Sequence, residues 1–373
     1  MAAPNSLRPP FRADHVGSLL RPKELRAAFR EHSAERMPMA AFTVILERAI
    51  SDVVKLQEDS GLPVITDGEF RRSSYWSRFV ARCDGFAIKP AVFKFRDDQG
   101  HEVDFTATYA CARLKRTQPL AVDEFECLRA LTRRTAKVTL PAPSTMHFYR
   151  CTDFADASLY GDARSFFVDL TRIYREEIAD LARAGCRYVQ LDEVALAMLC
   201  DPVIRAKLKA HGQDADALVD VYIGAINDAV REAPADMLIG VHMCRGNFRG
   251  RYLSAGGYES VAERLFSNSN VTHFLLEYDS ARAGDFRPLR YVPSSKGVVL
   301  GLISTKTPAL ESFEELRRRV GEAASYIEFD RLGISPQCGF ASTAAGNPMT
   351  EAEERAKLEL VAAAARAIWG DRD

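Results

Sequence analysis

The feature that most constrains the fold of this chain is a repeated alternation of short apolar runs with longer amphipathic stretches. The strand-like runs are residues 13–18, 63–67, 136–140, 188–193, 237–241, 272–277, 297–303 and 332–336. Helical periodicity marks residues 22–32, 39–60, 163–184, 215–231, 310–327 and 350–369. Strands that alternate with helices indicate a parallel sheet. Eight such strands in one α/β chain predict a (β/α)8 barrel, the TIM barrel.

One segment interrupts this alternation. Residues 91–95 and 103–107 alternate in polarity on either side of a polar stretch that ends at Gly100, a pattern that predicts a β-hairpin. We interpret residues 76 to 120 as an insertion after the second strand. Residues 1–10, rich in proline and polar residues, are predicted to be a flexible N-terminal tail. Residues 11–373 are predicted to form a single catalytic domain.

Charge and hydropathy exclude several classes of protein. The 373 residues include 50 Lys and Arg and 51 Asp and Glu, and no basic stripe suggests a nucleic-acid partner. No apolar run reaches the roughly 18 residues of a membrane span, and no signal-peptide core is present, so we expect a cytoplasmic protein. An open doubly wound sheet is the competing fold. The sequence lacks both the Gly-x-Gly-x-x-Gly turn and the phosphate loop expected of a nucleotide site there.

Potential metal ligands follow three of the predicted strands. His242 and Cys244 lie two residues apart at the end of the fifth strand, so their side chains share one face. Glu277 ends the sixth strand and Cys338 follows the eighth. Barrel enzymes carry their chemistry at these carboxyl ends. Each residue alone is equally explained as a buried thiol or a loop carboxylate, but together they predict a zinc site with four protein ligands.

The composition of this ligand set suggests the chemistry that it serves. Zinc bound by two thiolates and a carboxylate carries a negative formal charge and is a poor Lewis acid for making hydroxide. Such a site suits a substrate thiol, which it keeps as a nucleophilic thiolate near neutral pH. The activated sulfur then attacks a carbon electrophile. The eight cysteines of the chain form no Cys-x-x-Cys pair, which agrees with free thiols of which one or two act as ligands.

These motifs together resemble a known family. The matching stretches are His15-Val16-Gly17-Ser18, Gly68-Glu69, Leu191-Asp192-Glu193, His242-Met243-Cys244, Glu277 and Pro336-Gln337-Cys338-Gly339. In order and spacing they resemble the catalytic C-terminal barrel of cobalamin-independent methionine synthase, from about residue 11 to 370. The larger members carry a second, N-terminal barrel that this chain lacks. The chain is therefore similar to the short, single-barrel branch.

The resemblance implies a function and roles for the matching residues. It implies methyl transfer to the thiol of homocysteine, giving methionine, with zinc bound by His242, Cys244, Glu277 and Cys338. Val16 and Ser18 would contact the carboxylate of homocysteine, whereas Glu69 and Asp192 would hold its ammonium. Glu193 should point away from Asp192 by strand alternation. The candidate methyl donors are 5-methyltetrahydrofolate, a methyl-corrinoid protein and a small methylated sulfur compound, and a homodimer remains an open option.

The chain departs from the family pattern at several positions. The resemblance implies a histidine that helps to protonate the leaving group at the end of the seventh strand. Ile303 stands there, and an aliphatic side chain delivers no proton. The tryptophan that stacks on folate is also replaced, with Phe148 or Tyr149 as the nearest aromatic residue. Lys306 could act as an acid or an anion contact, although a solvated loop lysine is the favoured interpretation. Arg245 is expected to meet either an anionic substrate or a local carboxylate.

Three other functions compete with this reading. Related single barrels open epoxides with the thiol of coenzyme M, but Glu69 and Asp192 would repel its sulfonate. Similar barrels decarboxylate porphyrins without a metal, which leaves the Cys/His/Glu set unexplained. A catalytically inactive barrel that only binds a partner is the third alternative.

Overall fold

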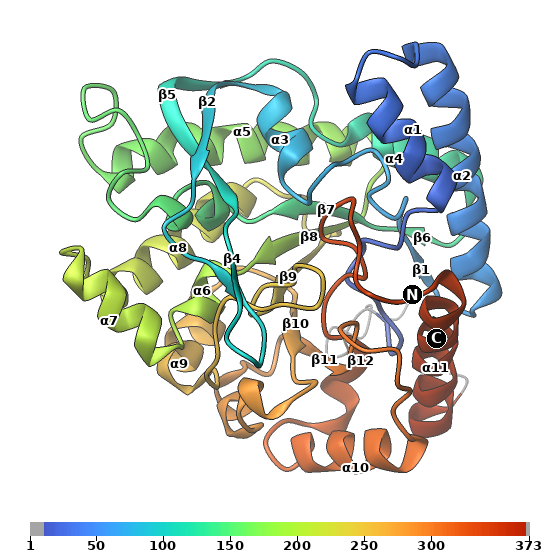
Figure 1. Cartoon of the computed structure of the whole chain (residues 1–373). Coiled ribbons are helices and arrows are strands. Elements are labelled where there is room, and N and C mark those ends of the chain that lie inside the picture. Colours follow the sequence, from blue (N-terminus) through green and yellow to red (C-terminus); the bar gives the residue numbers. More distant parts are fainter. Residues whose placement is uncertain (1–10, 371–373) are drawn as a thin grey trace.

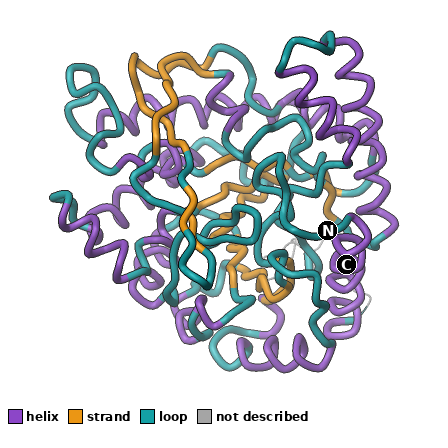
Figure 2. The backbone as a smooth tube through the Cα atoms, viewed as in Figure 1, coloured by secondary structure: helices purple, strands orange, loops and turns teal. Residues whose placement is uncertain are grey.

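Parallel strands form the centre of the protein, and helices surround them (Figures 1 and 2). The computed structural model of the chain describes residues 11–370. The predicted N-terminal tail, residues 1–10, lies outside the described residues. Within residues 11–370, no helix has both the length and the apolarity that crossing a membrane requires.

The elements follow one another in the order that the alternation predicted, with additions. The helices are α1 (Lys23–Ser33), α2 (Met39–Asp59), α3 (Ser77–Ala81), α4 (Val122–Leu131), α5 (Ala163–Ala184), α6 (Ala195–Met198), α7 (Pro202–Ala210), α8 (Ala215–Val230), α9 (Glu259–Asn268), α10 (Phe313–Ala323) and α11 (Glu351–Trp369). The strands are β1 (Val64–Ile65), β2 (Cys83–Pro90), β3 (Phe95–Arg96), β4 (Glu102–Val103), β5 (Thr106–Arg116), β6 (Thr135–Ala136), β7 (Val138–Pro141), β8 (Tyr188–Glu193), β9 (Leu238–Met243), β10 (His273–Glu277), β11 (Gly297–Ile303) and β12 (Leu332–Pro336).

The main sheet is parallel and has the strand order β12-β11-β10-β9-β8-β7. A second parallel pair joins β1 to β6, directly before β7 in the chain. On the far side, Ala13 forms a parallel bridge with Ile334 of β12. Nearly every residue of these strands is buried, which is the pattern expected when helices cover a parallel sheet. The predicted α/β fold with a parallel sheet is therefore confirmed.

Most of the predicted elements lie within a few residues of their predicted bounds, but the first strand does not form, the second is only two residues long and the third is divided. The strand predicted at residues 13–18 is wrong, because only the bridge at Ala13 forms and Gly17, with φ of 137°, turns the chain out of an extended path. The third strand is split at Lys137 into β6 and β7. Helix α5 matches its prediction because both of its ends are encoded locally. The Asp162 side chain accepts a hydrogen bond from the Ser165 N–H, and Gly185 ends the helix in the left-handed conformation.

Antiparallel strands occupy the segment that interrupts the alternation. β3 pairs with β4 across residues 97–101, close to the predicted turn, and β2 pairs with β5 over a longer stretch than was predicted. This ribbon packs on the loop that follows β9. Arg96 forms an antiparallel bridge with Tyr252, and the ring of Phe95 lies 5.4 Å from that of Phe248. The segment thus covers the carboxyl end of β9, where His242 lies (Figure 1).

A buried ion pair joins the N-terminal segment to the sheet. The Nζ of Lys137 lies 2.7 Å from Oδ1 of Asp14, and both side chains are fully buried. Lys137 also donates to Oε1 of Gln190 at 3.0 Å, while the Tyr188 hydroxyl donates to Oδ2 of Asp14 at 2.6 Å. Burial raises the pKa of Asp14, but the charges of Lys137 and His15 and the hydrogen bonds from Lys137 and Tyr188 together hold this pKa below its ordinary value. Each charge of the pair therefore depends on the other.

We expect Lys137→Met to lower the free energy of unfolding by about 3–5 kcal/mol, because it leaves the Asp14 carboxylate buried without a counter-ion. Urea unfolding followed by circular dichroism measures this loss. Lys55→Met is the matched control, since Lys55 pairs with Asp59 on the surface and its loss should cost less than about 1 kcal/mol. Equal losses for the two variants would contradict the prediction.

Candidate active site

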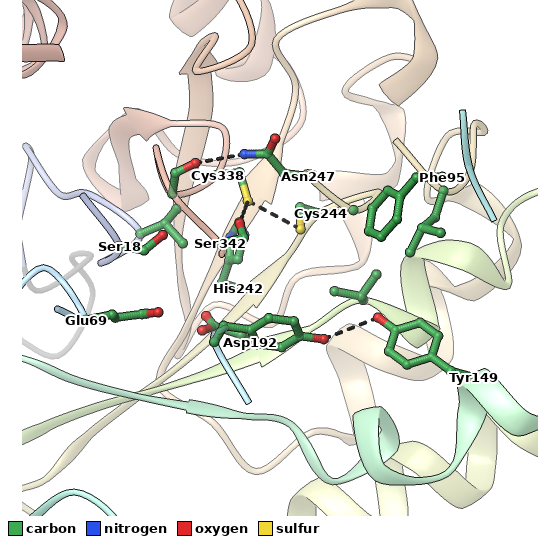
Figure 3. A pocket seen from close by; sticks show the side chains of 16 residues that line it. Ser18, Glu69, Phe95, Tyr149, Asp192, His242, Cys244, Asn247, Cys338 and Ser342 are labelled. Carbon is green, nitrogen blue, oxygen red and sulfur yellow. Dashed lines mark hydrogen bonds between the residues drawn. The ribbon is translucent and has the colours of Figure 1, made fainter. Parts of the chain in front are cut away.

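A small cavity of about 50 Å³ lies at the carboxyl ends of the parallel strands (Figure 3). Seven of the eight residues predicted as metal ligands or substrate contacts line it: Val16, Ser18, Glu69, Asp192, His242, Cys244 and Cys338. They come from the N-terminal segment, the turn after β1, the ends of β8 and β9, and the loop after β12. We call this space the inner cavity. Segments more than 300 residues apart in the chain therefore meet here, as Val16 and Cys338 illustrate.

His242, Cys244 and Cys338 form a buried cluster whose potential ligand atoms all lie within 4.8 Å of one another. The two sulfurs are 3.6 Å apart, and both ring nitrogens of His242 are buried without a hydrogen-bond partner. Zinc–sulfur bonds of about 2.3 Å at a tetrahedral angle place two sulfurs roughly 3.7 Å apart. The hydrogen bond from Cys244 lowers the pKa of Cys338 well below its ordinary value, although burial opposes the shift. The donor set and its spacing fit a zinc ion.

Glu277 lies outside this cluster of three, so its role as the fourth ligand stays a prediction. It ends β10 and is fully buried, but its carboxylate has other partners. Oε2 accepts the backbone N–H of Arg245 at 2.6 Å, and Oε1 accepts a hydrogen bond from Nζ of Lys306 at 3.3 Å. Each carboxylate oxygen thus accepts one hydrogen bond.

The two cations of uncertain role are both structural neighbours of Glu277. The Lys306 side chain is only 6% exposed and also lies 3.8 Å from Asp279, so the interpretation as a solvated loop lysine is wrong. The Arg245 guanidinium is buried over the ring of Tyr258 and donates to the backbone carbonyls of Gly256 and Glu277. It thus pairs with backbone oxygens and an aromatic face, instead of the anionic substrate or side-chain carboxylate that was expected.

Glu69 and Asp192 contribute two carboxylates to the inner cavity, and in Figure 3 Glu69 lies on the side away from Phe95 and Tyr149. Asp192 accepts a hydrogen bond from Gln190, which in turn contacts Lys137. Burial, together with the neighbouring charge of Glu69, raises the pKa of Asp192 to about 7. Two buried carboxylates that destabilise each other's charge favour a cation between them. This is the arrangement expected for recognition of an ammonium group.

The local geometry of Glu69 also indicates a constrained position. Its φ of 59° lies in the left-handed region, which is uncommon for a residue with a side chain. The Asp67 carboxylate holds this turn by accepting the Glu69 N–H at 2.8 Å. The Thr139 hydroxyl donates to Oε1 of Glu69 at 2.7 Å, and Arg72 lies 3.6 Å from the same oxygen. Glu193, by contrast, points away as predicted and accepts hydrogen bonds from Ser144 and from the Leu196 N–H.

Close backbone packing positions Ser18 in the cavity. The loop after β12 runs against the N-terminal segment, and the Phe340 N–H donates to the Ser18 carbonyl at 2.8 Å. A Cβ at Gly339 would overlap the Ser18 hydroxyl, so this approach requires glycine. Asn247 accompanies the contact by donating to the Gly339 carbonyl at 2.8 Å. Ser18 is therefore fixed by a residue that lies more than 300 positions away in the sequence.

Several residues of the inner cavity were not identified from the sequence. They are Tyr75, Phe95, Tyr149, Val194, Gly246, Asn247, Leu253, Gly339 and Ser342. Of these, Tyr149 carried a signal as an aromatic residue near the third strand, and Gly339 stood in the motif that contains Cys338. Its hydroxyl lies 3.3 Å from that of Tyr75, so the two tyrosines close one side of the cavity (Figure 3). Phe95 belongs to the antiparallel ribbon, and no strand-end argument could place it here.

We expect Gly339→Ala to destabilise the protein by about 1–3 kcal/mol, because the new methyl group overlaps the Ser18 hydroxyl. The melting temperature measured by differential scanning calorimetry should fall accordingly. Gly321→Ala, in α10, is the control, since no atom lies within 4 Å of its added Cβ. The control should raise stability by up to about 1 kcal/mol. A melting temperature unchanged by Gly339→Ala would show that the loop can move away from Ser18.

Comparisons with known proteins agree with the motifs at the strand ends. The family model described as "Cobalamin-independent synthase, Catalytic domain" matches residues 11–366. The chain is 38% identical over 367 residues to the uncharacterized protein YxjH of Bacillus subtilis, and the alignment covers 96% of this chain and 95% of that protein. It is 27% identical to a methionine synthase of Pyrococcus furiosus, and that alignment covers 87% of this chain and 84% of the synthase. A crystal structure of a putative vitamin-B12 independent methionine synthase from Listeria monocytogenes superposes with a TM-score of 0.76 at 30% identity, covering 98% of this chain and 99% of that one. The sequence resemblance is thus confirmed, and the chain belongs to the cobalamin-independent methionine synthase family of methyltransferases.

Proposed function

We propose that this enzyme transfers a methyl group to the thiol of homocysteine, giving methionine, and that it does so with a bound zinc ion. The observation that carries the proposal is the shared inner cavity. It places the cluster of His242, Cys244 and Cys338 beside the carboxylates of Glu69 and Asp192. One end of the cavity thus suits a thiol and the other an ammonium. Homocysteine carries both groups.

His242, Cys244 and Cys338 would hold the zinc ion and leave a fourth position for the substrate sulfur. Catalytic zinc sites commonly use three protein ligands in this way. The bound metal would keep the thiol of homocysteine as a thiolate near neutral pH. Glu277, which ends β10, would supply the fourth ligand, a place that it would yield to the substrate sulfur.

The remaining polar residues of the cavity would orient the amino acid. Glu69 and Asp192 would bind its ammonium by charge-assisted hydrogen bonds, and the Ser18 hydroxyl with the backbone near Val16 would bind its carboxylate. This orientation turns the side-chain sulfur toward Cys244 and Cys338. The two carboxylates disfavour the alternative thiol, coenzyme M, because its sulfonate would be repelled.

The donor side of the reaction would lie at the opposite face of the sulfur. Candidate donors are 5-methyltetrahydrofolate, a methyl-corrinoid protein and a small methylated sulfur compound. Each presents a methyl carbon that the sulfur attacks along the line of the bond that breaks. We also expect the enzyme to act in the cytoplasm.

We further infer that the parallel strands form a closed (β/α)8 barrel within a single domain, residues 11–373, and that the antiparallel ribbon is an insertion. Cys244 follows β9 and Cys338 follows β12, and these two strands are three positions apart in the sheet. In a flat sheet they would be separated by roughly 14 Å. Their sulfurs lie 3.6 Å apart, which favours a strongly curved sheet. Hydrogen bonds between the residue 17–19 segment and the turn after β1, from Thr66 to Gly17 and from Leu19 to Gly68, support closure.

We expect the purified chain to bind about one zinc ion, and Cys338→Ala to lose it, because a thiolate ligand is removed. Metal content after dialysis, measured by plasma mass spectrometry, tests this without reference to activity. Cys186→Ala is the control, since Cys186 is equally buried but lies outside the inner cavity and should retain the ion. Glu277→Gln should weaken binding by at least about tenfold, because it removes the carboxylate of the fourth ligand. Full zinc content in Cys338→Ala would refute the proposed site.

We expect Asp192→Asn to reduce the affinity for homocysteine by about 10- to 100-fold, because a charge-assisted hydrogen bond to its ammonium is weakened. Calorimetric titration should compare homocysteine with 4-mercaptobutanoate, which has the same skeleton without the amino group. The substitution should leave the affinity for 4-mercaptobutanoate nearly unchanged. An equal loss for both ligands would mean that Asp192 does not bind the ammonium.

A further inference from the structure

A second and larger space, which we call the outer cavity, adjoins the inner cavity. Its volume is about 560 Å³, within the range of sites that bind small molecules. Tyr75, Phe95, Tyr149, Asn247 and Ser342 line both cavities. A ligand in the outer cavity would therefore reach the position of the substrate sulfur past these five side chains.

Aromatic rings form much of the outer cavity. Phe95 is one of the lining residues, and its ring centroid lies 5.0 Å from that of Phe105 and 5.4 Å from that of Phe248. Phe105 meets Tyr149 edge to face at 5.1 Å, and Trp76 contributes a further ring to the lining. The faces of tryptophan, tyrosine and phenylalanine carry negative charge density that attracts cations, and such cages recognise methylated onium groups.

The charged residues of the lining also favour a cationic ligand. Among the described residues that line the outer cavity there is no lysine, arginine or histidine, and Asp104 supplies the charge. Lys94 lies 3.4 Å from Asp104 and an equal distance from Glu102, so its single charge is shared between two carboxylates. A donor with a polyanionic tail finds no cationic partner in this lining, whereas a cationic donor meets both aromatic faces and a carboxylate.

We propose that the outer cavity binds the methyl donor, and that this donor is a small sulfonium compound whose positive charge is held by the aromatic rings and Asp104. The inference rests on the proposed function, because it takes the acceptor to be the thiolate of homocysteine in the inner cavity. Recognition of the positive charge would position the methyl group at the boundary formed by Tyr75, Phe95 and Tyr149.

The chemistry of the transfer supports a sulfonium donor. The thiolate electron pair forms the new S–CH3 bond, and the old C–S bond breaks with its electron pair moving to the sulfonium sulfur. The donor leaves as a neutral sulfide, so charge balances and no proton is required. A methylated amine such as 5-methyltetrahydrofolate would leave as a nitrogen anion that needs a proton. Ile303, which stands where the family resemblance implies a proton-donating histidine, is fully buried and cannot supply one.

The direct test follows a labelled methyl group. The zinc-loaded full chain is incubated with homocysteine and one of four donors: trideuteromethyl S-methylmethionine, trideuteromethyl-labelled trimethylsulfonium, labelled 5-methyltetrahydrofolate or labelled methylcobalamin. Mass spectrometry then measures labelled methionine. We expect transfer from at least one sulfonium to be more than tenfold faster than from the folate or the corrinoid.

Binding of the positive charge can be tested independently of transfer. Choline and its neutral carbon isostere, 3,3-dimethylbutan-1-ol, are compared as competitors of the sulfonium donor. Choline should compete at least about tenfold more strongly, because only it carries charge to the aromatic rings. Trp76→Leu should remove most of this preference, whereas Trp76→Phe should keep it, since Trp76 lines the outer cavity but not the inner one. Homocysteine affinity should be unchanged in both variants.

A pair of surface carboxylates provides the matched control. Asp104→Asn should weaken binding of the cation about threefold, whereas Glu102→Gln should not, because Glu102 shares Lys94 but does not line the outer cavity. Equal effects of the two substitutions, or equal competition by choline and its isostere, would overturn the inference.

The outcomes separate this inference from the proposed function. Labelled methionine formed only from the folate or the corrinoid would refute the sulfonium donor and leave the homocysteine methyltransferase intact. Transfer from a sulfonium to another thiol, such as 2-mercaptoethanol, without transfer to homocysteine would refute the proposed acceptor and support the donor inference.

Discussion

The buried pair of Asp14 and Lys137 is the interaction on which the cavity most depends. It fixes the N-terminal segment, which forms only a single bridge with β12, against β6, β7 and β8. Lys137 also contacts Gln190, and Gln190 donates to both Asp192 and the Val16 carbonyl. One ammonium thus organises two of the proposed substrate contacts at once. Since neither charge tolerates burial alone, the arrangement forms as a unit.

The two cavities differ in the charged groups that line them, and this difference matches the two substrates of the proposed reaction. The inner cavity has two carboxylates at one side and two thiols with an imidazole at the other, which suits an amino acid that carries a thiol. The outer cavity has aromatic faces and a single carboxylate from Asp104. The side chains between them, Tyr75, Phe95 and Tyr149, are uncharged. In the proposed reaction, a methyl group would pass between two sulfur atoms, with aromatic faces beside the positive charge of the donor and the bound zinc beside the thiolate of the acceptor.

Local sequence predicted those parts of the site that depend on strand periodicity. His242 and Cys244 share a face because they lie two residues apart at the end of β9, and Glu193 points away from Asp192 for the same reason. The aromatic residues could not be placed, because Phe95 and Phe105 belong to a ribbon that folds back over β9. Lys306 was misjudged because its loop sequence is polar, and only the tertiary structure brings Glu277 and Asp279 against its ammonium.

The sequence by itself determined the alternation of strands and helices, the motifs at the strand ends and the family to which they point. These features are encoded locally, by apolar periodicity, capping residues and short spacings. The tertiary structure alone decided which groups engage Glu277, namely Lys306 and the N–H of Arg245, and that an aromatic cavity adjoins the thiol site. Both depend on how the sheet curves and where a distant ribbon packs. Long-range packing sets these distances, and no spacing along the chain records it.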